Sequence, residues 1–279
     1  MAQIPLLDGI NGLPKVRVQS KDGASAEVYL HGAHVTSWVP AGGTEQLFIS
    51  PKADFKPGAA IRGGVPVIFP QFAEVGLLPK HGFARSLPWE LIESRSDMAL
   101  LRLEDSDATR AIWPHQFSAE FSVRVWGAEI ELLLAVTNSG EKPFRFTSAL
   151  HTYLKVDDVR AATVAGLEGL LYRDAAAGAV ESEQEDDSVS FPGEVDRVYF
   201  GASHPLQLIQ KSGAVRVVSR GFADAVLWNP GPEKCARLAD MEPNGYLGFV
   251  CIEAAAVREP LILRPGEAWQ GVQKLKRLK

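Results

Sequence analysis

The sequence has little of what would mark a disulfide-stapled, nucleic-acid-binding or membrane-spanning protein. It contains only two cysteines in 279 residues, Cys235 and Cys251, which are too few for a disulfide framework and fit reduced thiols. It has no surplus of positive charge either, because 29 Lys and Arg residues are outnumbered by 34 Asp and Glu residues, for a net charge of -5. Binding to the phosphate backbone of a nucleic acid is therefore not expected. An anionic small ligand would need a local cluster of positive side chains.

Long apolar runs are also missing. No stretch approaches the roughly 20 apolar residues that a membrane-spanning helix needs. The first nine residues, MAQIPLLDG, lack the basic region and apolar core of a signal peptide. With 46% hydrophobic and 23% charged residues, the composition is that of an average globular protein. We therefore expect a cytoplasmic protein that has no membrane partner and acts as a monomer.

Short β-like runs separated by turns dominate the chain. Residues 16–20 and 26–30 alternate in polarity on either side of a Lys-Asp-Gly turn, which is the signal of a hairpin. Residues 117–126 and 129–138 flank a Gly-Ala pair and predict a second, longer hairpin. Further strands are predicted at residues 33–39, 46–50, 89–94, 99–104, 144–154, 161–170, 188–191, 214–219, 225–228, 247–254 and 260–264.

Helices and linkers are scarce. No segment shows a helical period over three turns, although residues 107–113 and 233–241 could each form one short helix. The stretch from Asp174 to Asp187 is rich in Ala and then acidic, and we expect an exposed loop without chemistry there. No repeat or Pro/Ser-rich linker divides the chain. The pattern predicts an all-β fold, one large antiparallel β-sandwich domain spanning residues 1–279 with at most a few short helices.

The motifs of metal and nucleotide enzymes are absent. The six histidines show no metalloprotease helix motif, and no cysteines are spaced for zinc. His31 and His34 lie three residues apart on a predicted strand and would face opposite ways. The sequence contains no P-loop, no dinucleotide fingerprint and no Gly-x-Ser-x-Gly motif. We therefore expect neither a metal nor another cofactor.

One polar loop stands out. Residues 61–71 (IRGGVPVIFPQ) and 80–85 (KHGFAR) set charged and polar side chains among glycines and prolines, which disfavour a helix or a long central strand. The two glycines after Arg62 would let the backbone come close to another group. Arg62 and Arg85 could bind an anion, because Arg makes bidentate contacts with phosphate or carboxylate. They could equally be solvated side chains of a surface connection.

Two further side chains could perform acid–base chemistry. Period-two counting in residues 144–154 places His151 on the face opposite the more apolar one, toward solvent or a cleft. Glu253 lies in an apolar strand, where burial would raise its pKa toward the range of a general base at neutral pH. Both have plainer interpretations. His151 could be a hydrogen-bonded structural histidine, and Glu253 a carboxylate at a strand end that reaches water.

Six short blocks carry a resemblance to a known family. They are residues 61–71, 81–85 (HGFAR), 150–153 (LHTY), 195–199 (VDRVY), 228–230 (WNP) and 250–253 (VCIE). In this order they resemble the hexose-6-phosphate mutarotases (glucose-6-phosphate 1-epimerases), a branch of the aldose 1-epimerase superfamily, from about Ala33 to the C-terminus. The first block is specific to the phosphosugar branch, whereas the His and Glu blocks occur across the superfamily. The resemblance implies a β-supersandwich of the galactose-mutarotase type.

The resemblance also implies roles for seven residues, and no cofactor. His151 would be the general acid that protonates the ring oxygen of the sugar, and Glu253 the general base that takes the proton from the C1 hydroxyl. The ring would open to the aldehyde, rotate about the C1–C2 bond and reclose as the other anomer. The substrate-binding residues would be Arg62 and Arg85 for the phosphate, with Gln71 nearby, and His81 and Asp196 for the sugar.

Several alternatives stay open on the sequence. Asp196 could simply pair with Arg197 at the surface. The nearest rival activity is an aldose 1-epimerase for unphosphorylated sugars, which would depend much less on Arg62. A non-catalytic sugar-phosphate sensor and a structural β-sandwich module are further possibilities on the same fold.

Overall fold

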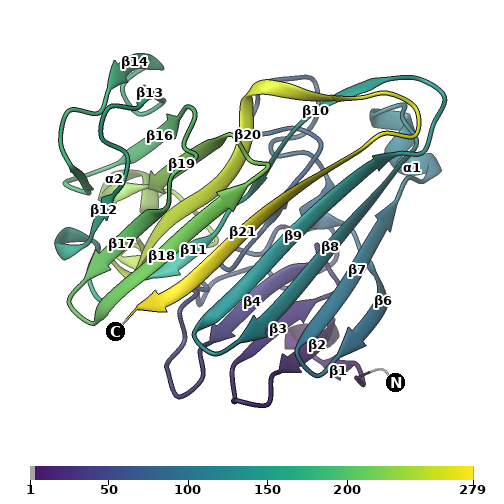
Figure 1. The fold of residues 1–279 in the computed structure, drawn as a ribbon, viewed down its shortest axis with the longest axis horizontal. Coiled ribbons are helices and arrows are strands. Elements are labelled where there is room, and N and C mark those ends of the chain that lie inside the picture. Colours follow the sequence, from purple (N-terminus) through teal and green to yellow (C-terminus); the bar gives the residue numbers. More distant parts are fainter. Residues whose placement is uncertain (1–3, 279) are drawn as a thin grey trace.

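The structure, a computed structural model, describes residues 4–278, and its regular secondary structure is mainly antiparallel β-sheet (Figure 1). The four-stranded sheet contains, in order, β1 (Leu7–Asp8), β2 (Pro14–Gln19), β3 (Ser25–Tyr29) and β4 (His34–Val39). The eight-stranded sheet contains β14 (Val180–Glu183), β13 (Leu171–Asp174), β16 (Val195–Tyr199), β19 (Asp224–Asn229), β20 (Phe249–Leu263), β10 (Phe144–Leu150) and β5 (Val67–Ile68), with β11 (Tyr153–Lys155) also on β20.

The nine-stranded sheet is the largest. Its order is β15 (Ser188–Ser190), β12 (Thr163–Ala165), β17 (Leu206–Gln210), β18 (Gly213–Arg220), β21 (Ala268–Leu278), β9 (Glu129–Asn138), β8 (Phe117–Trp126), β7 (Met98–Glu104) and β6 (Glu90–Arg95). The helical elements are α1 (Asp107–Ile112), α2 (Gly231–Cys235) and the 3-10 turns η1 (Ile10–Gly12), η2 (Ala84–Ser86), η3 (Val159–Ala161) and η4 (Gly245–Gly248). Within residues 4–278, no helix is long and apolar enough to cross a membrane.

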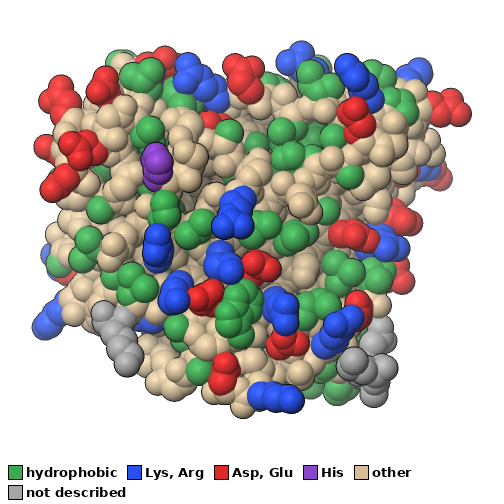
Figure 2. All heavy atoms as spheres, in the orientation of Figure 1, with side chains coloured by type: hydrophobic (Ala, Val, Ile, Leu, Met, Phe, Trp, Pro, Cys, Tyr) green, Lys and Arg blue, Asp and Glu red, His purple; other side chains and the backbone are tan. Residues whose placement is uncertain are grey.

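Both smaller sheets pack against the nine-stranded sheet across one shared apolar core. Val28 of β3, Leu134 of β9 and Ile252 of β20 all belong to it, and Figure 1 shows β2 to β4 behind β7 to β9. Strands β8 and β9 alternate more and less buried side chains along their length, as strands with one core face do. On the outer side, Lys276 of β21 pairs with Glu129 of β9 at 2.9 Å, and charges of both signs are interspersed over the face seen in Figure 2.

Strand β20 differs because both of its faces are covered. Eight consecutive residues, from Phe249 to Ala256, are buried. Ile252 faces the core between the sheets, whereas Cys251 belongs to a second apolar cluster on the opposite face of the eight-stranded sheet. A strand buried on both faces has no alternation in polarity. Glu253, in the middle of this run, is therefore a carboxylate deep in the protein and not one at a strand end.

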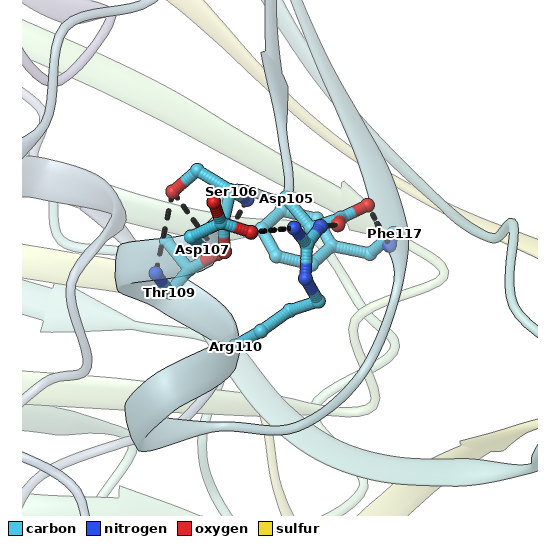
Figure 3. Close-up of polar contacts among 6 residues, drawn as sticks. All are labelled: Asp105, Ser106, Asp107, Thr109, Arg110 and Phe117. Atoms are coloured by element: carbon cyan, nitrogen blue, oxygen red, sulfur yellow. Dashed lines mark hydrogen bonds and ion pairs between the residues drawn. The ribbon is translucent and has the colours of Figure 1, made fainter.

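The short helix α1 is fixed to the start of β8. Ser106 and Thr109 form a capping box, in which the Ser106 hydroxyl accepts from the Thr109 N–H at 3.3 Å (Figure 3). Arg110 pairs with Asp105, and the other carboxylate oxygen of Asp105 accepts from the Phe117 N–H at 3.1 Å. These contacts join both ends of the connection between β7 and β8. They confirm the short helix predicted in this region.

Most predicted strands are present, including both hairpins, but several predictions had wrong bounds. Segment 144–154 is divided into β10 and β11, because the chain leaves the ladder at His151 and Thr152. Segments 247–254 and 260–264 form the single strand β20, since Pro260 lies where the ladder with β10 is already interrupted. Segment 46–50 makes only isolated bridges.

Other predictions missed regular structure. The acidic stretch from Asp174 to Asp187 is exposed for the most part, yet it contains β14, which pairs with β13 at the sheet edge. Its Gln184 is buried and accepts a hydrogen bond from Tyr199 at 2.9 Å. Helix α2 begins at Gly231 and ends at Cys235, earlier than the predicted 233–241. Strands β13, β16, β17 and β21 were not predicted.

Candidate active site

A cleft of about 370 Å³ opens on the face of the eight-stranded sheet that points away from the core between the sheets. That volume suits a small-molecule ligand. Its charged or titratable lining residues are Arg62, Lys80, His81, Arg85, His151, Asp196, Lys234 and Glu253. Its walls are completed by Phe72, Ala73, Val226, Trp228 and Leu238. Six of the seven residues predicted for the site therefore lie together, although they come from distant parts of the chain.

His151 and Glu253 meet because of strand register. The pairs Leu150↔Ala254 and Tyr153↔Cys251 lie on either side of them in the antiparallel arrangement with β20. His151 and Glu253 are therefore directly opposite each other, and opposite residues share one face of a sheet. His151 Nε2 lies 3.3 Å from Glu253 Oε1. Both side chains are buried, with 7% and 2% of their residues' surfaces exposed.

Burial favours the uncharged form of each partner. Burial lowers the pKa of His151 well below its usual value, and electrostatic interactions with His81, Arg62 and Arg85 lower it further. Burial also raises the pKa of Glu253 well above its usual value, with Asp196 adding to the rise and Arg85 opposing it. The second polar atom of each group, His151 Nδ1 and Glu253 Oε2, is buried without a hydrogen-bond partner among residues 4–278. The pair can therefore exchange a proton across its contact.

His151 is held between aromatic rings. The ring of Tyr153 stacks on it with centroids 4.8 Å apart and planes 10° from parallel. Trp228 and His81 each approach it edge-on at 5.7 Å. These contacts fix the plane of the imidazole.

His81 is held as a neutral hydrogen-bond donor. The ring nitrogen Nδ1 accepts from the Ala73 backbone N–H at 3.2 Å. The backbone N–H of His81 donates to the Ala73 carbonyl at 3.0 Å. A ring nitrogen that accepts a hydrogen bond carries no proton, so neutral His81 carries its proton on Nε2. Burial, and then the charge of Arg85, lower the pKa of His81 to about 3. Its Nε2–H can therefore donate to a ligand at neutral pH.

The two arginines are held differently. Arg62 Nε donates to Asp240 Oδ2 at 3.0 Å, and its Nη1 donates to the Tyr153 hydroxyl at 3.0 Å. Arg85 Nη2 donates to the Lys80 carbonyl at 2.9 Å. In the part of the chain that the structure describes, no carboxylate pairs with Arg85. Its charge is therefore the more available of the two for an anion.

The glycines after Arg62 serve the protein's own packing. Gly63 has φ +110, and a Cβ there would lie 2.3 Å from the Phe48 carbonyl oxygen. Gly64 has φ +59, and a Cβ there would lie 2.2 Å from the Val35 oxygen. The close approach predicted for these residues is therefore made to neighbouring backbone. It places Arg62 in the lining of the cleft.

Gln71 is the predicted site residue that the structure does not bring to the cleft. Its amide donates to the carbonyls of Ala73 at 3.2 Å and Leu78 at 3.0 Å, and its oxygen accepts from the Leu78 N–H at 3.1 Å. The side chain is buried and engaged with its own loop. Gln71 supports the segment that carries Ala73 and His81, and does not line the cleft itself.

Asp196 lies in the cleft with a lysine that was not predicted. Lys234 Nζ is 3.6 Å from Asp196 Oδ2 and 2.6 Å from Glu194 Oε1. Burial raises the pKa of Asp196, and Lys234 opposes the rise. The alternative pairing of Asp196 with Arg197 is wrong, because Arg197 bonds to Asp174 at 2.9 Å. Asp196 thus faces the cleft while its neighbour in sequence points elsewhere.

Some lining residues had a signal in the sequence and others had none. Tyr153 and Trp228 belong to the LHTY and WNP blocks, and Tyr153 lies two residues after His151, a spacing that puts both on one face of a strand. Lys234 on α2, and Asp240 beyond it, carried no local pattern. Across residues 4–278, no three His, Cys, Asp or Glu side chains gather as metal ligands would.

Comparisons with known proteins find relatives over nearly the whole chain. A family model described as aldose 1-epimerase matches residues 14–276. A protein of Cenchrus ciliaris, named "Putative glucose-6-phosphate 1-epimerase", is 38% identical over 277 residues, covering 94% of this chain and 84% of that protein. A protein of Escherichia coli K12 with the same name is 41% identical over 244 residues, covering 84% of this chain and 80% of that protein.

Solved structures share the fold. A crystal structure from Salmonella typhimurium, described as a "putative mutarotase", matches with a TM-score of 0.86 at 31% identity and covers 99% of this chain and 97% of that one. The predicted all-β supersandwich is confirmed, and so is the resemblance carried by the six blocks. Since the family model spans nearly the whole sequence, the chain belongs to the aldose 1-epimerase family.

Proposed function

We propose that this protein interconverts the α and β anomers of a hexose 6-phosphate, with glucose 6-phosphate as the first candidate. The observation that carries the proposal is the buried contact of 3.3 Å between His151 and Glu253, in a cleft that also contains Arg85 without a carboxylate partner among the described residues. The names of the relatives support the same substrate class. Mutarotation needs one acid and one base, and the cleft provides both.

The reaction follows from the positions of the two groups. Glu253, as carboxylate, takes the proton of the C1 hydroxyl, and the C1–O1 bond becomes a carbonyl as the bond from C1 to the ring oxygen breaks. His151, as imidazolium, gives its proton to that ring oxygen. The open aldehyde then rotates about C1–C2, and the hydroxyl attacks the other face of the carbonyl while both protons return. Positioned acids and bases each contribute typically about 10²–10⁴-fold.

The protonation states close this cycle. Ring opening converts a carboxylate and an imidazolium into a carboxylic acid and a neutral imidazole, so the pair keeps the same number of protons. Burial favours this second, uncharged state of His151 and Glu253. From it, His151 can accept a proton and Glu253 can return one, which is what ring closure requires. No proton has to enter from solvent during the cycle.

The remaining residues would bind the substrate. Arg62 and Arg85 would hold the phosphate. His81 would donate from Nε2 to a sugar oxygen, and Asp196 would accept from a sugar hydroxyl. The cleft is lined by four Lys or Arg side chains and two carboxylates, in a chain of net charge -5. This matches the local cluster of positive charge that an anionic ligand needs.

The test is two-dimensional NMR exchange between the anomers of glucose 6-phosphate and, separately, of glucose. Wild type should accelerate exchange of the phosphosugar, and Glu253→Gln should abolish the acceleration. Glu120→Gln, which changes a half-buried carboxylate paired with Arg102 on the nine-stranded sheet, is the control and should stay active. Equal acceleration with glucose would favour an enzyme for unphosphorylated sugars. Binding of glucose 6-phosphate without exchange would favour a sugar-phosphate sensor.

A further inference from the structure

The hydrogen-bond ladder beside the acid–base pair is incomplete. Thr152 lies opposite Ile252, and in a regular antiparallel ladder such a pair exchanges two hydrogen bonds. The Ile252 N–H does donate to the Thr152 carbonyl, at 3.1 Å. The Thr152 N–H, however, donates to the Leu150 carbonyl at 2.9 Å, because the chain turns there. The carbonyl of Ile252 is thus left without its ladder donor.

Gln273 supplies the missing donor from the other sheet. It lies on β21, and its Nε2 donates to the Ile252 carbonyl at 3.0 Å. Its Oε1 accepts from the hydroxyl of Thr152. Gln273 and Thr152 are both fully buried. One amide thereby joins the two strands across the sandwich at the point where their own ladder fails.

Packing alone does not explain a glutamine at this position. The core-facing positions on either side of it along β21 are Gly271 and Leu275, and its neighbour on β9 is the buried Leu132. An amide in such surroundings costs free energy unless its polar atoms are hydrogen-bonded. Both polar atoms of Gln273 are bonded, and each of the two partners is the sequence neighbour of a residue that lines the cleft.

We infer that Gln273 is a positioning residue that holds His151 and Glu253 at their working separation, an inference that rests on the proposed function. Thr152 directly follows His151, and Ile252 directly precedes Glu253. Side chains alternate along strands, so His151 and Glu253 project into the cleft while Thr152 and Ile252 face Gln273. The two hydrogen bonds of Gln273, to Thr152 and to Ile252, form a clamp. This clamp holds the backbone beside His151 and the backbone beside Glu253 from the side opposite the cleft. A misplacement of about 1 Å can cost about 10²-fold in rate.

The experiment compares Gln273→Leu with Asn138→Leu. Asn138 is an equally buried amide on β9, and its Nδ2 donates to the Leu263 carbonyl at 2.9 Å, at the far end of the same β20. Both variants lose a buried amide that braces β20. For glucose 6-phosphate, Gln273→Leu should lower kcat by about 10- to 100-fold with KM within about twofold. Asn138→Leu should leave kcat within about twofold of wild type, even where its melting temperature falls as much as that of Gln273→Leu.

A second pair of variants tests the other arm of the clamp and covers the case in which Gln273→Leu does not fold. Thr152→Val removes the hydroxyl and keeps the shape, whereas Thr152→Ser keeps the hydroxyl. The serine variant should recover most of the kcat that the valine variant loses. Equal kcat in both, or a folded Gln273→Leu protein with wild-type kcat, would overturn the inference.

A readout that needs no turnover separates this inference from the proposed function. The ring signals of His151, followed by NMR over pH, should change in Gln273→Leu and stay unchanged in Asn138→Leu. Should wild type accelerate no anomer exchange, the proposed function would fail, and the ring signals would still decide whether Gln273 positions the pair. Unchanged His151 signals in Gln273→Leu would count against the clamp whatever the activity.

Discussion

Arg85→Ala is expected to reduce turnover of a phosphosugar far more than turnover of the free sugar. Arg85 reaches the cleft from η2, and only the Lys80 carbonyl accepts from it among the hydrogen bonds of the described residues. Its other N–H groups remain available to a phosphate. Arg62 is a less clean choice, because Arg62→Ala would also leave Asp240 and Tyr153 without their donor.

The size of the effect follows from the contact that is lost. A hydrogen bond to a charged group contributes about 1.5–3 kcal/mol. Since about 1.4 kcal/mol corresponds to a factor of ten, kcat/KM for glucose 6-phosphate should fall about 10- to 150-fold. Glucose has no phosphate for Arg85 to contact. Its kcat/KM, which should be much lower from the start, should therefore change about threefold at most in Arg85→Ala. Arg85→Lys, which keeps the charge without the planar fork, should fall between wild type and alanine.

The assay is anomer-exchange NMR over a range of concentrations of each sugar. Arg124→Ala is the control, since the exposed Arg124 of β8 pairs with Asp97 in the turn between β6 and β7. Equal losses on both sugars would show that Arg85 only maintains the shape of the cleft. An unchanged kcat/KM for the phosphosugar would refute the reasoning, because the phosphate would then be bound elsewhere.

Three further predictions concern chemistry, pH and packing. In anomer-exchange assays, His151→Asn and Glu253→Gln should each lower kcat by about 10²–10⁴-fold. The double variant should lose little more activity than either single variant, because the two groups act as a unit. Fully buried His34 has its pKa lowered to about 3 from 6.5, so the unfolded chain binds its proton more readily. From pH 6.5 down to about 3, His34 should therefore reduce the free energy of unfolding by about 1.4 kcal/mol per pH unit. Urea unfolding of His34→Asn should show a pH slope smaller than that of wild type by this amount. Gly63→Ala should destabilise by about 2–5 kcal/mol in thermal unfolding, whereas Gly58→Ala, at φ +80 with open space around it, should lose only about 1–2 kcal/mol.

The sequence predicts strands well where one face meets the core and the other does not. Strands β8 and β9 alternate throughout, and their predicted bounds agree with the structure. Strand β20 is covered on both faces, so its apolar run has no period, and two strands, 247–254 and 260–264, were predicted where the structure has one. Periodicity reports the difference between two faces, and it fails where there is none.

For the candidate site, local sequence pattern indicated the chemistry of single residues but not which residues come together. The types of residue at His151 and Glu253 indicated acid–base chemistry, but their contact depends on the register of strands about 100 residues apart in sequence. Lys234 and Gln273 lacked any local pattern, because each acts on partners brought close only by folding. For Gln71 the error was the reverse, because the sequence predicted a site residue that does not line the cleft. It belongs to the most specific block, yet it is engaged with its own loop.

The proposed phosphate site and the acid–base pair would be connected through charge. After burial and His81, the charges of Arg62 and Arg85 lower the pKa of His151. A phosphate bound to the arginines would offset part of that positive charge, so the pKa of His151 would rise and its ring would hold a proton more readily. The substrate's own phosphate would thus favour the imidazolium that donates to the ring oxygen, which a free sugar cannot do. We expect inorganic phosphate to raise the pKa of His151 in NMR titrations of wild type and to have little effect in Arg85→Ala. An equal rise in both would mean that the phosphate acts on His151 without Arg85.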